Sequence, residues 1–216
     1  MATKLNEFTA AEMRSAMIDS QLRPSNVTDA NVVAAMNAVA REDFVPAAFA
    51  SVAYMDRPIA LGAGRLLNAP LVTGRMLVEA RVTAGERVLL IGAGTGYVAA
   101  LLAKMGASVV AVEENAELAA AAQVDGVEWV AGPLNAGAAD KGPYSLIIID
   151  GAIEVLPAAL VDQLADGGRV IAGRRDGAVG RLVRGVKANG AVNLQRFVDM
   201  DIASLPGFEA PKGFEF

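Results

Sequence analysis

A glycine-rich segment is the first place in this sequence where residue types and spacing suit chemistry. Glycines alternate with small side chains in the order Gly92, Ala93, Gly94, Thr95 and Gly96. Glycine permits a tight turn from strand to helix and lets a ligand approach the backbone, and the following helix begins with free amides. A turn that is rich in glycine only for packing is the alternative. The position between an aliphatic run and a helical stretch favours a ligand cradle.

A carboxylate stands at the matching position of the next predicted strand. The aliphatic run after the glycine segment ends at Glu113, 17 positions beyond Gly96, and Glu114 follows it. An acidic side chain at the tip of this strand can accept hydrogen bonds from both hydroxyls of a ribose. We therefore interpret residues 92–96, Glu113 and Glu114 as a site for an adenosine-type cofactor. The alternative is that the glutamates are simply solvated.

The composition excludes several other kinds of site. The 216 residues include no histidine and no cysteine. This excludes Cys/His zinc sites, thiolate nucleophiles, disulfides and imidazole bases, and no cluster of carboxylates suggests a metal. A net charge of −5 and a pI of about 4.9 argue against nucleic acid and anionic membrane surfaces as partners.

Alternating elements have to position these residues. From Arg87 onward, short apolar runs of the kind found in buried strands alternate with helical stretches. This order predicts an α/β fold with a doubly wound, mostly parallel, Rossmann-like sheet that is covered on both faces. The predicted strands cover residues 88–91, 108–112, 127–130, 144–149 and 169–172, and the predicted helices cover 97–104, 116–123 and 157–164.

The region before this core reads as a helical N-terminal extension. Thr9 and Glu12 fit a capping box at the start of a helix that should end at Arg23, before a proline. A second helix is expected from Thr28 to Ala40. We expect short helices and loops over residues 43–58 and a further helix at 75–80.

The C-terminal region predicts an antiparallel hairpin, because strands over 181–186 and 192–198 flank Asn189-Gly190, a strong turn signal. We expect one domain, without a signal peptide or membrane span and located in the cytoplasm. The sequence does not indicate the oligomeric state. The expected parts are a helical extension with substrate-side elements (1–80), a cofactor-binding core (81–174) and a C-terminal hairpin (175–216).

Tyr97 distinguishes two classes of adenosine-binding fold. A dinucleotide fold prefers a small residue there, where the pyrophosphate meets the helix, so a nicotinamide oxidoreductase is disfavoured. A glycine segment followed by an aromatic residue, with a C-terminal antiparallel hairpin, instead resembles the class I S-adenosylmethionine-dependent methyltransferases. The resemblance implies that S-adenosyl-L-methionine, which has no pyrophosphate, is the cofactor.

Within that class, the chain resembles the protein-L-isoaspartate O-methyltransferases over nearly its whole length. The resemblance implies a carboxyl O-methyltransferase of protein repair, whose partner is a protein or peptide with an isoaspartyl or other carboxylate. The matching segments, in chain order, are Met17–Pro24, Val27–Asp29, Arg41–Pro46, Ala53–Pro58, Gly62–Gly64, Gly92–Tyr97 and Leu164–Val170.

Three places depart from the family pattern. Where the family usually has Thr-x-Ser-x-Pro, Leu66 replaces the threonine and Asn68 the serine. Leu90 replaces the usual acidic residue near the end of the first strand, and Gly132-Pro133-Leu134 replaces Gly-Asp-Gly. These departures support a second hypothesis, a catalytically degenerate relative that binds the cofactor or a protein partner without methyl transfer.

Asn68 and Arg65 are the candidate catalytic residues at the acceptor. A carboxylate is ionised at pH 7 and needs no base, so the protein has to align its oxygen with the methyl group and exclude water. The Asn68 amide can donate two hydrogen bonds, and Arg65 can pair with a carboxylate through two. Alternatively, Asn68 only shapes the turn before Pro70 and Arg65 is solvated.

Overall fold

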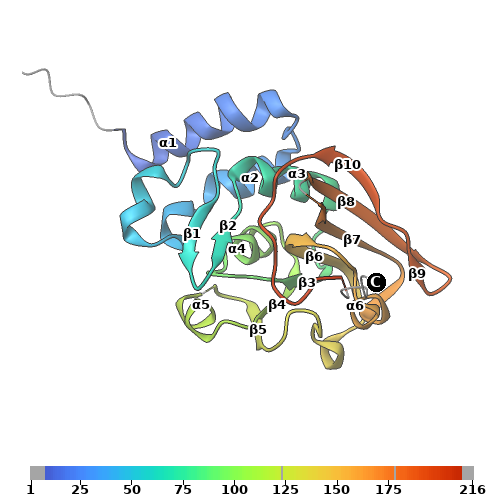
Figure 1. The fold of residues 1–216 in the computed structure, drawn as a ribbon. Helices are drawn as coiled ribbons and strands as arrows, with labels where there is room; N and C mark the ends of the chain where they lie inside the picture. Colours follow the sequence, from blue (N-terminus) through green and yellow to red (C-terminus); the bar gives the residue numbers. More distant parts are fainter. Residues whose placement is uncertain (1–7, 123, 178, 211–216) are drawn as a thin grey trace, which may run out of the picture.

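The chain folds around an eight-stranded sheet in a computed structural model that describes residues 8–122, 124–177 and 179–210 (Figure 1). Five strands run parallel in the order β7-β6-β3-β4-β5, so β3 has β4 on one side and β6 on the other. The predicted mostly parallel α/β sheet is confirmed. The bounds are β3 (Arg87–Ile91), β4 (Ser108–Glu113), β5 (Val127–Ala131), β6 (Tyr144–Ile153) and β7 (Leu164–Asp176).

Antiparallel strands extend the sheet beyond β7. β8 (Val179–Ala188) pairs with β7, and β9 (Ala191–Val192) and β10 (Gln195–Asp199) both fold back on β8. Asn189 and Gly190 turn the chain with φ of 51° and 76°, as expected for this hairpin turn. The predicted hairpin is confirmed, although its second strand is split into β9 and β10. The pairing of β7 with β8 was not predicted.

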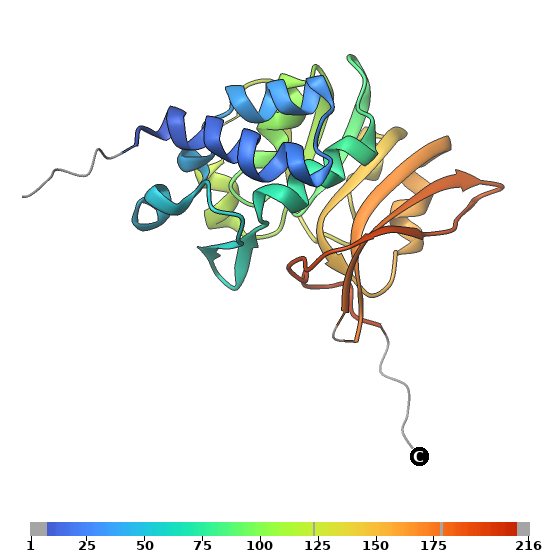
Figure 2. The same ribbon diagram turned by 90° about the horizontal axis from the view of Figure 1, so that it is seen from above.

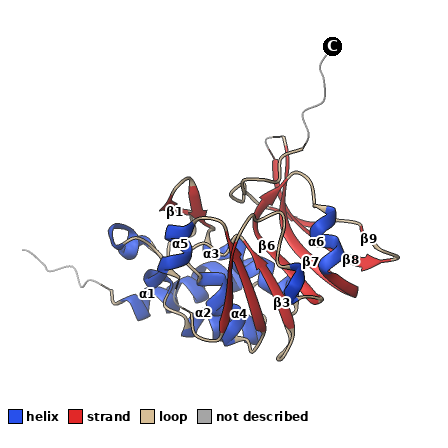
Figure 3. Ribbon diagram, turned by 90° about the horizontal axis from the view of Figure 1, so that it is seen from below, coloured by secondary structure: helices blue, strands red, loops and turns tan. Residues whose placement is uncertain are grey.

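Both faces of the sheet are buried against apolar layers. Along β3, Val88 and Leu90 face one core cluster, whereas Leu89 and Ile91 face the other. The first cluster includes side chains of α2 (Ala30–Ala38), α3 (Pro70–Ala80) and α4 (Tyr97–Lys104), and the second includes Leu160 of α6 (Ala158–Gln163). Figure 2 shows the N-terminal helices grouped together, and Figure 3 shows α6 well apart from α2 and α4.

The N-terminal helices begin and end close to the predicted positions. α1 (Ala10–Met17) has the expected capping box: the Thr9 hydroxyl accepts from the Glu12 amide at 3.2 Å, and the Glu12 carboxylate accepts from the Thr9 amide at 2.8 Å. A π turn (Ile18–Leu22) continues this helix, and a 3-10 turn (Arg23–Ser25) follows it, so helical backbone extends past the predicted end at Arg23 and includes Pro24 in a first turn, where proline is tolerated.

Several helix boundaries differ from the predictions. α2 starts after Asp29 rather than at Thr28, because the Asp29 carboxylate caps the amides of its first turn. α3 starts at Pro70 rather than at residue 75, since proline is favoured in a first helical turn. α5 (Ala116–Ala121) ends before its predicted limit, and Gln123 lies outside the described residues.

A short hairpin, which the sequence analysis did not predict, precedes α3. It consists of β1 (Ile59–Gly62) and β2 (Arg65–Leu67) and turns through Ala63 and Gly64. On β2, the side chains of Arg65 and Leu67 are buried, whereas Leu66 is 41% exposed. The hairpin therefore directs Arg65 into the molecule.

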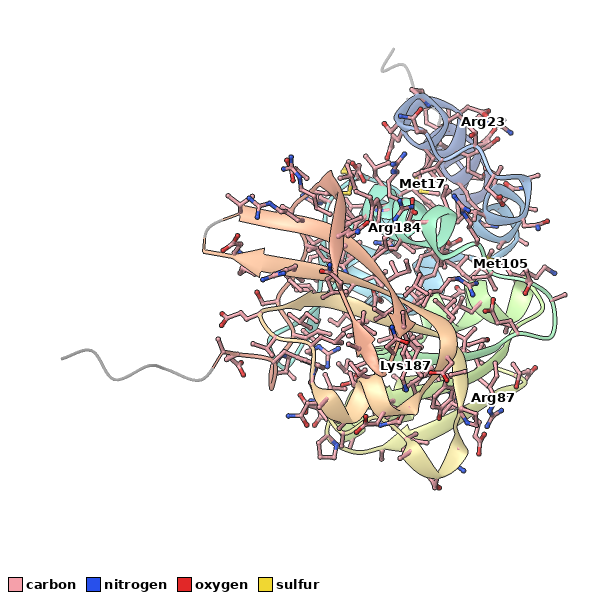
Figure 4. The ribbon with its side chains drawn as sticks, turned by 90° about the vertical axis from the view of Figure 1, so that its right-hand side faces the viewer. Met17, Arg23, Arg87, Met105, Arg184 and Lys187 are labelled. Atoms are coloured by element: carbon pink, nitrogen blue, oxygen red, sulfur yellow. The ribbon has the colours of Figure 1, made fainter. Side chains whose placement is uncertain are left out.

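Two charged side chains of β8 connect the antiparallel strands to α3 and to the start of β7. Arg184 and Lys187 both belong to β8 (Figure 4). Arg184 pairs with Glu79 of α3, and Lys187 donates to the carbonyl oxygen of Leu164 at 2.7 Å.

In the described part of the chain, every helix is too short or too polar to cross a lipid bilayer.

Arg169 connects three segments at the amino ends of the central strands. Its guanidinium donates to both carboxylate oxygens of Glu86, at 2.6 and 2.8 Å, and to the carbonyl oxygens of Ala80 and Arg81 at the end of α3. Burial raises the pKa of Glu86, but the hydrogen bonds from Arg169 and from the Thr83 amide outweigh it, so the pKa lies below its ordinary value.

Arg169→Met should lower the free energy of unfolding by about 2 kcal/mol at neutral pH, because it removes charged hydrogen bonds that are partly buried. A depressed pKa in the folded state gives stability that is present above the ordinary pKa and is lost as pH falls through the folded pKa. Wild type should therefore lose stability on acidification more steeply than Arg169→Met does. Urea unfolding at several pH values measures both effects. Arg23→Met, which removes an exposed ion pair with Asp19, is the control and should change little.

Candidate cofactor and acceptor site

The glycine segment forms a turn at the carboxyl end of β3. Gly92, Gly94 and Gly96 have φ values of 76°, 55° and 99°, a region that side chains rarely adopt. The amides of Gly92 and Ala93 donate to the carbonyl oxygen of Val112 at 3.0 and 3.2 Å, which ties the turn to β4. The turn lies beside the junction of β3 and β6, where a doubly wound sheet binds ligands.

Glu113 meets this turn as a fully buried carboxylate. One of its oxygens, Oε2, accepts from the Gly94 amide at 2.7 Å. The other, Oε1, accepts from the Asn115 amide at 3.0 Å and from Nη1 of Arg65 at 2.6 Å. The structure thus brings together three of the predicted site residues: Gly94, Glu113 and Arg65. Glu114 is exposed beside them, and its cofactor role stays a prediction.

Arg65 lies on the cofactor side of the site and is 7% exposed. Besides its ion pair with Glu113, its Nη2 lies 3.2 Å from the position that a Cβ on Gly92 would take. The guanidinium therefore extends from the carboxylate at the end of β4 to the turn after β3. Its proposed role toward an acceptor carboxylate stays a prediction.

Asn68 connects three parts of the chain and is 1% exposed. Its Nδ2 donates to Oδ1 of Asp150 at 2.8 Å, and its Oδ1 accepts from the Ala203 amide at 3.2 Å. Its backbone oxygen accepts from Arg41 at 2.6 Å. Nδ2 also donates to the carbonyl oxygen of Asp150 at 3.3 Å. The amide is thus fixed in orientation, and both of its donor contacts are made to Asp150.

Asp150 is a site residue that the sequence analysis missed. It lies in β6 and is 8% exposed. Burial raises its pKa, and this outweighs the hydrogen bond from Asn68 and the charges of Arg65 and Arg41, which lower it. A carboxylate in an otherwise aliphatic strand was the available signal, because a buried acid needs a specific partner.

Arg41 supports the site from the N-terminal region. The residue is fully buried, and its Nε donates to the carbonyl oxygen of Ala53 at 2.8 Å. Its guanidinium lies 4.8 Å from the centre of the Tyr97 ring, a cation–π contact. Because Tyr97 begins α4 and Asn68 precedes α3, Arg41 fixes the acceptor junction relative to the glycine turn.

A cavity of about 390 Å³ opens on the other side of Asn68. It is bounded by the hairpin and α3 on one side and by the chain after β10 on the other. Its lining includes Asp56, Leu66, Asn68, Arg175, Ala203 and Ser204. The cavity therefore brings Asn68 and the chain after β10 to one solvent-open site.

The sheet order, the glycine turn and the carboxylate at the end of β4 define a Rossmann-like methyltransferase. A sequence model of the family "Protein-L-isoaspartate(D-aspartate) O-methyltransferase (PCMT)" matches residues 12–201. The chain belongs to this family, whose cofactor is S-adenosyl-L-methionine.

Individual relatives agree with this assignment. The protein-L-isoaspartate O-methyltransferase of Methylorubrum populi is 41% identical over 164 residues, which cover 73% of this chain and 77% of the relative. A putative enzyme of this name from Plasmodium falciparum, solved in complex with S-adenosyl-L-homocysteine, has a TM-score of 0.76 and 20% identity, over 92% of this chain and 99% of that one. A second solved protein-L-isoaspartate O-methyltransferase gives the same score and identity, and this chain covers 66% of its length.

The residues of the crevice fit the family's cofactor. Glu113 is a buried carboxylate at the strand end where such folds bind a ribose diol, and the three glycines of the turn present backbone without side chains. In the conformation described, however, Arg65 and Leu205 extend into this space, within 3.2 and 3.0 Å of the Cβ position of Gly92. Both side chains therefore lie against the glycine turn.

Glu113→Gln should weaken binding of S-adenosylhomocysteine, since it removes a charged acceptor whose hydrogen bonds contribute on the order of 1.5–3 kcal/mol each before compensation by water. Isothermal titration calorimetry measures the change. Glu114→Gln is the matched comparison on the neighbouring exposed carboxylate. Unchanged affinity in Glu113→Gln together with a loss in Glu114→Gln would transfer the ribose role to Glu114.

Proposed function

We propose that this protein transfers the methyl group of S-adenosylmethionine to the side-chain carboxylate of isoaspartyl residues in proteins or peptides, a step of protein repair. The observation that carries this proposal, in a chain of this family, is the position of Asn68. The residue lines the solvent-open cavity, and its side chain bonds to Asp150 of β6, beside the cofactor crevice. An acceptor held at Asn68 lies next to the place where the methyl group is delivered.

A carboxylate acceptor suits a site without histidine. The acceptor is ionised at pH 7 and supplies its own electron pair. The new bond joins its oxygen to the methyl carbon while the carbon–sulfur bond breaks and its electrons stay on sulfur. S-adenosylmethionine, when bound, supplies a methyl group that the sulfonium charge already activates. The chain's own task is to align the acceptor and to exclude water.

Arg65 connects the two halves of the proposed site. Its guanidinium shares Oε1 of Glu113 with the Asn115 amide. A ribose diol on Glu113 competes for the same carboxylate and frees Arg65. The freed guanidinium can then pair with the acceptor carboxylate through two hydrogen bonds. This arrangement favours filling of the cofactor crevice before the acceptor cavity.

Leu66 favours a second candidate function, binding of the cofactor or a protein partner without methyl transfer. It stands where the family has a hydroxyl-bearing threonine, and it is 41% exposed. Leucine cannot donate a hydrogen bond to an acceptor. The two candidate functions differ in whether the wild-type protein catalyses methyl transfer.

Asn68→Ala should slow methylation of an isoaspartyl peptide by roughly tenfold or more, because a hydrogen bond to a charged acceptor is worth at least about 1.4 kcal/mol in the transition state. Transfer of labelled methyl groups measures the rate, with the matching aspartyl peptide as the control substrate. The double variant Leu66→Thr/Asn68→Ser, which restores the family pattern, should raise the rate. Turnover by the double variant but not by the wild type would favour the second candidate function.

At a pH above the raised pKa of Asp150, Asp150→Asn should lower KM for the isoaspartyl peptide by about tenfold, which corresponds to roughly 1.4 kcal/mol of relieved repulsion between carboxylates. The asparagine oxygen can still accept from Asn68. In wild type, the neutral form of Asp150 dominates below its raised pKa. Burial and the charge of Glu113 raise this pKa, and the charges of Arg65 and Arg41 lower it. KM should therefore rise with pH in wild type and stay flatter in Asp150→Asn. An equal pH dependence in both proteins would contradict this role.

A further inference from the structure

The chain after β10 crosses the carboxyl ends of the central strands as a strap, defined here as Ala203–Phe208. Ser204 forms a parallel bridge with Ala152 of β6. On either side of the bridge, the Ala152 amide donates to the carbonyl oxygen of Ala203 at 2.7 Å, and the Leu205 amide donates to the carbonyl oxygen of Ala152 at 2.9 Å. The strap is therefore bonded along β6, the neighbour of β3.

Leu205 points from the strap into the crevice between β3 and β6. Its Cδ atoms lie 3.0 Å from the position that a Cβ on Gly92 would take, and its Cγ lies 2.4 Å from that of Gly151. Gly92 follows β3, and Gly151 lies within β6. Neither residue has a side chain, so Leu205 packs directly against the backbone of both strands. The residue is 6% exposed. An apolar side chain of this chain thus fills the point at which doubly wound sheets bind ligands.

Further contacts hold the strap beyond Leu205. Phe208 is 2% exposed, and its carbonyl oxygen accepts from the amides of Glu154 and Val155 at 3.1 and 3.2 Å. Asn135, after β5, donates to the carbonyl oxygen of Gly207 at 3.0 Å. The strap therefore covers the crevice from β6 to the loop that follows β5.

The strap also separates the two halves of the proposed site. Ala203 and Ser204 line the acceptor cavity, whereas Leu205, the next residue, lies in the crevice at Gly92. Methyl transfer needs the acceptor oxygen and the methyl carbon in contact. With the strap in place, the chain itself stands between cavity and crevice.

We infer that the strap is an autoinhibitory lid, in which Leu205 occupies the cofactor crevice and has to leave it before S-adenosylmethionine binds. The inference rests on the proposed function, because it assigns the crevice to that cofactor. Leu205 therefore competes with S-adenosylmethionine for the crevice and does not contribute to the binding site of this cofactor. Opening joins the acceptor cavity to the crevice, so one movement admits the cofactor and completes the site for transfer.

Leu205→Ala tests the lid, with S-adenosylhomocysteine as the probe and calorimetry as the measurement. A ligand that binds only the open form has an apparent Kd that is raised by the rarity of that form. Removing the competing side chain should tighten binding by about tenfold if the open form is roughly a tenth as populated in wild type. The variant should also unfold at a lower temperature without ligand, since a packed side chain is lost.

Leu160→Ala is the matched control. Leu160 is fully buried in the same apolar cluster, on α6, where its Cδ2 lies 2.8 Å from the position that a Cβ on Gly137 would take. This variant should also unfold at a lower temperature but bind the probe as wild type does. Hydrogen exchange in wild type gives a second readout, because the Leu205 amide should exchange faster when the probe is added.

The outcomes separate the lid from the proposed function. Weaker or unchanged binding in Leu205→Ala, while wild type binds, would overturn the lid and leave the cofactor assignment standing. Slower exchange at the Leu205 amide on adding the probe would also overturn it, because the strap would then close over the ligand. Absence of binding in wild type and both variants would overturn the cofactor assignment and the lid with it.

Discussion

Glu113 brings a carboxylate into the interior at the end of β4, where an unpaired charge is strongly unfavourable. Its partners come from three directions: the glycine turn, the first turn toward α5 and the β1–β2 hairpin. The need to satisfy this one charge therefore fixes the turn, the position of β4 and the depth to which Arg65 is inserted. Under the proposed function, a ribose on the same carboxylate leaves Arg65 as a buried cation that needs another anion, and the acceptor carboxylate is that anion.

The acceptor side depends on a neutral group rather than on a charge. The Oδ1 atom of Asn68 accepts a hydrogen bond from the Ala203 amide, and its Nδ2 donates to Asp150. An asparagine can donate to two oxygens of Asp150 while it accepts from the Ala203 amide, whereas a serine hydroxyl has a single hydrogen to donate. The departure from the family's serine is thus matched by a carboxylate on β6 within hydrogen-bond distance. The two residues form one unit, and substitution of either alters the other's environment.

The parts of the site that could be predicted from sequence are those with local signals. The glycine segment and Glu113 each follow an aliphatic run, and the carboxyl ends of parallel strands meet at one edge of the sheet. The ion pair of Arg65 with Glu113 and the bond of Asn68 with Asp150 join residues 48 and 82 positions apart. No local pattern specifies such partners. The β1–β2 hairpin was missed because its strands are too short to show alternation, and Leu205 stands in a segment with no periodic signal at all.

The sequence separation of the contacts at Asn68 has a consequence for biosynthesis. Asn68 binds Asp150 and Ala203, which follow it by 82 and 135 positions. A chain emerging from the ribosome presents Asn68 long before either partner exists, and Ala203 follows only after β10. The contacts that fix Asn68 are therefore among the last to assemble, after the helices and central strands have been synthesised.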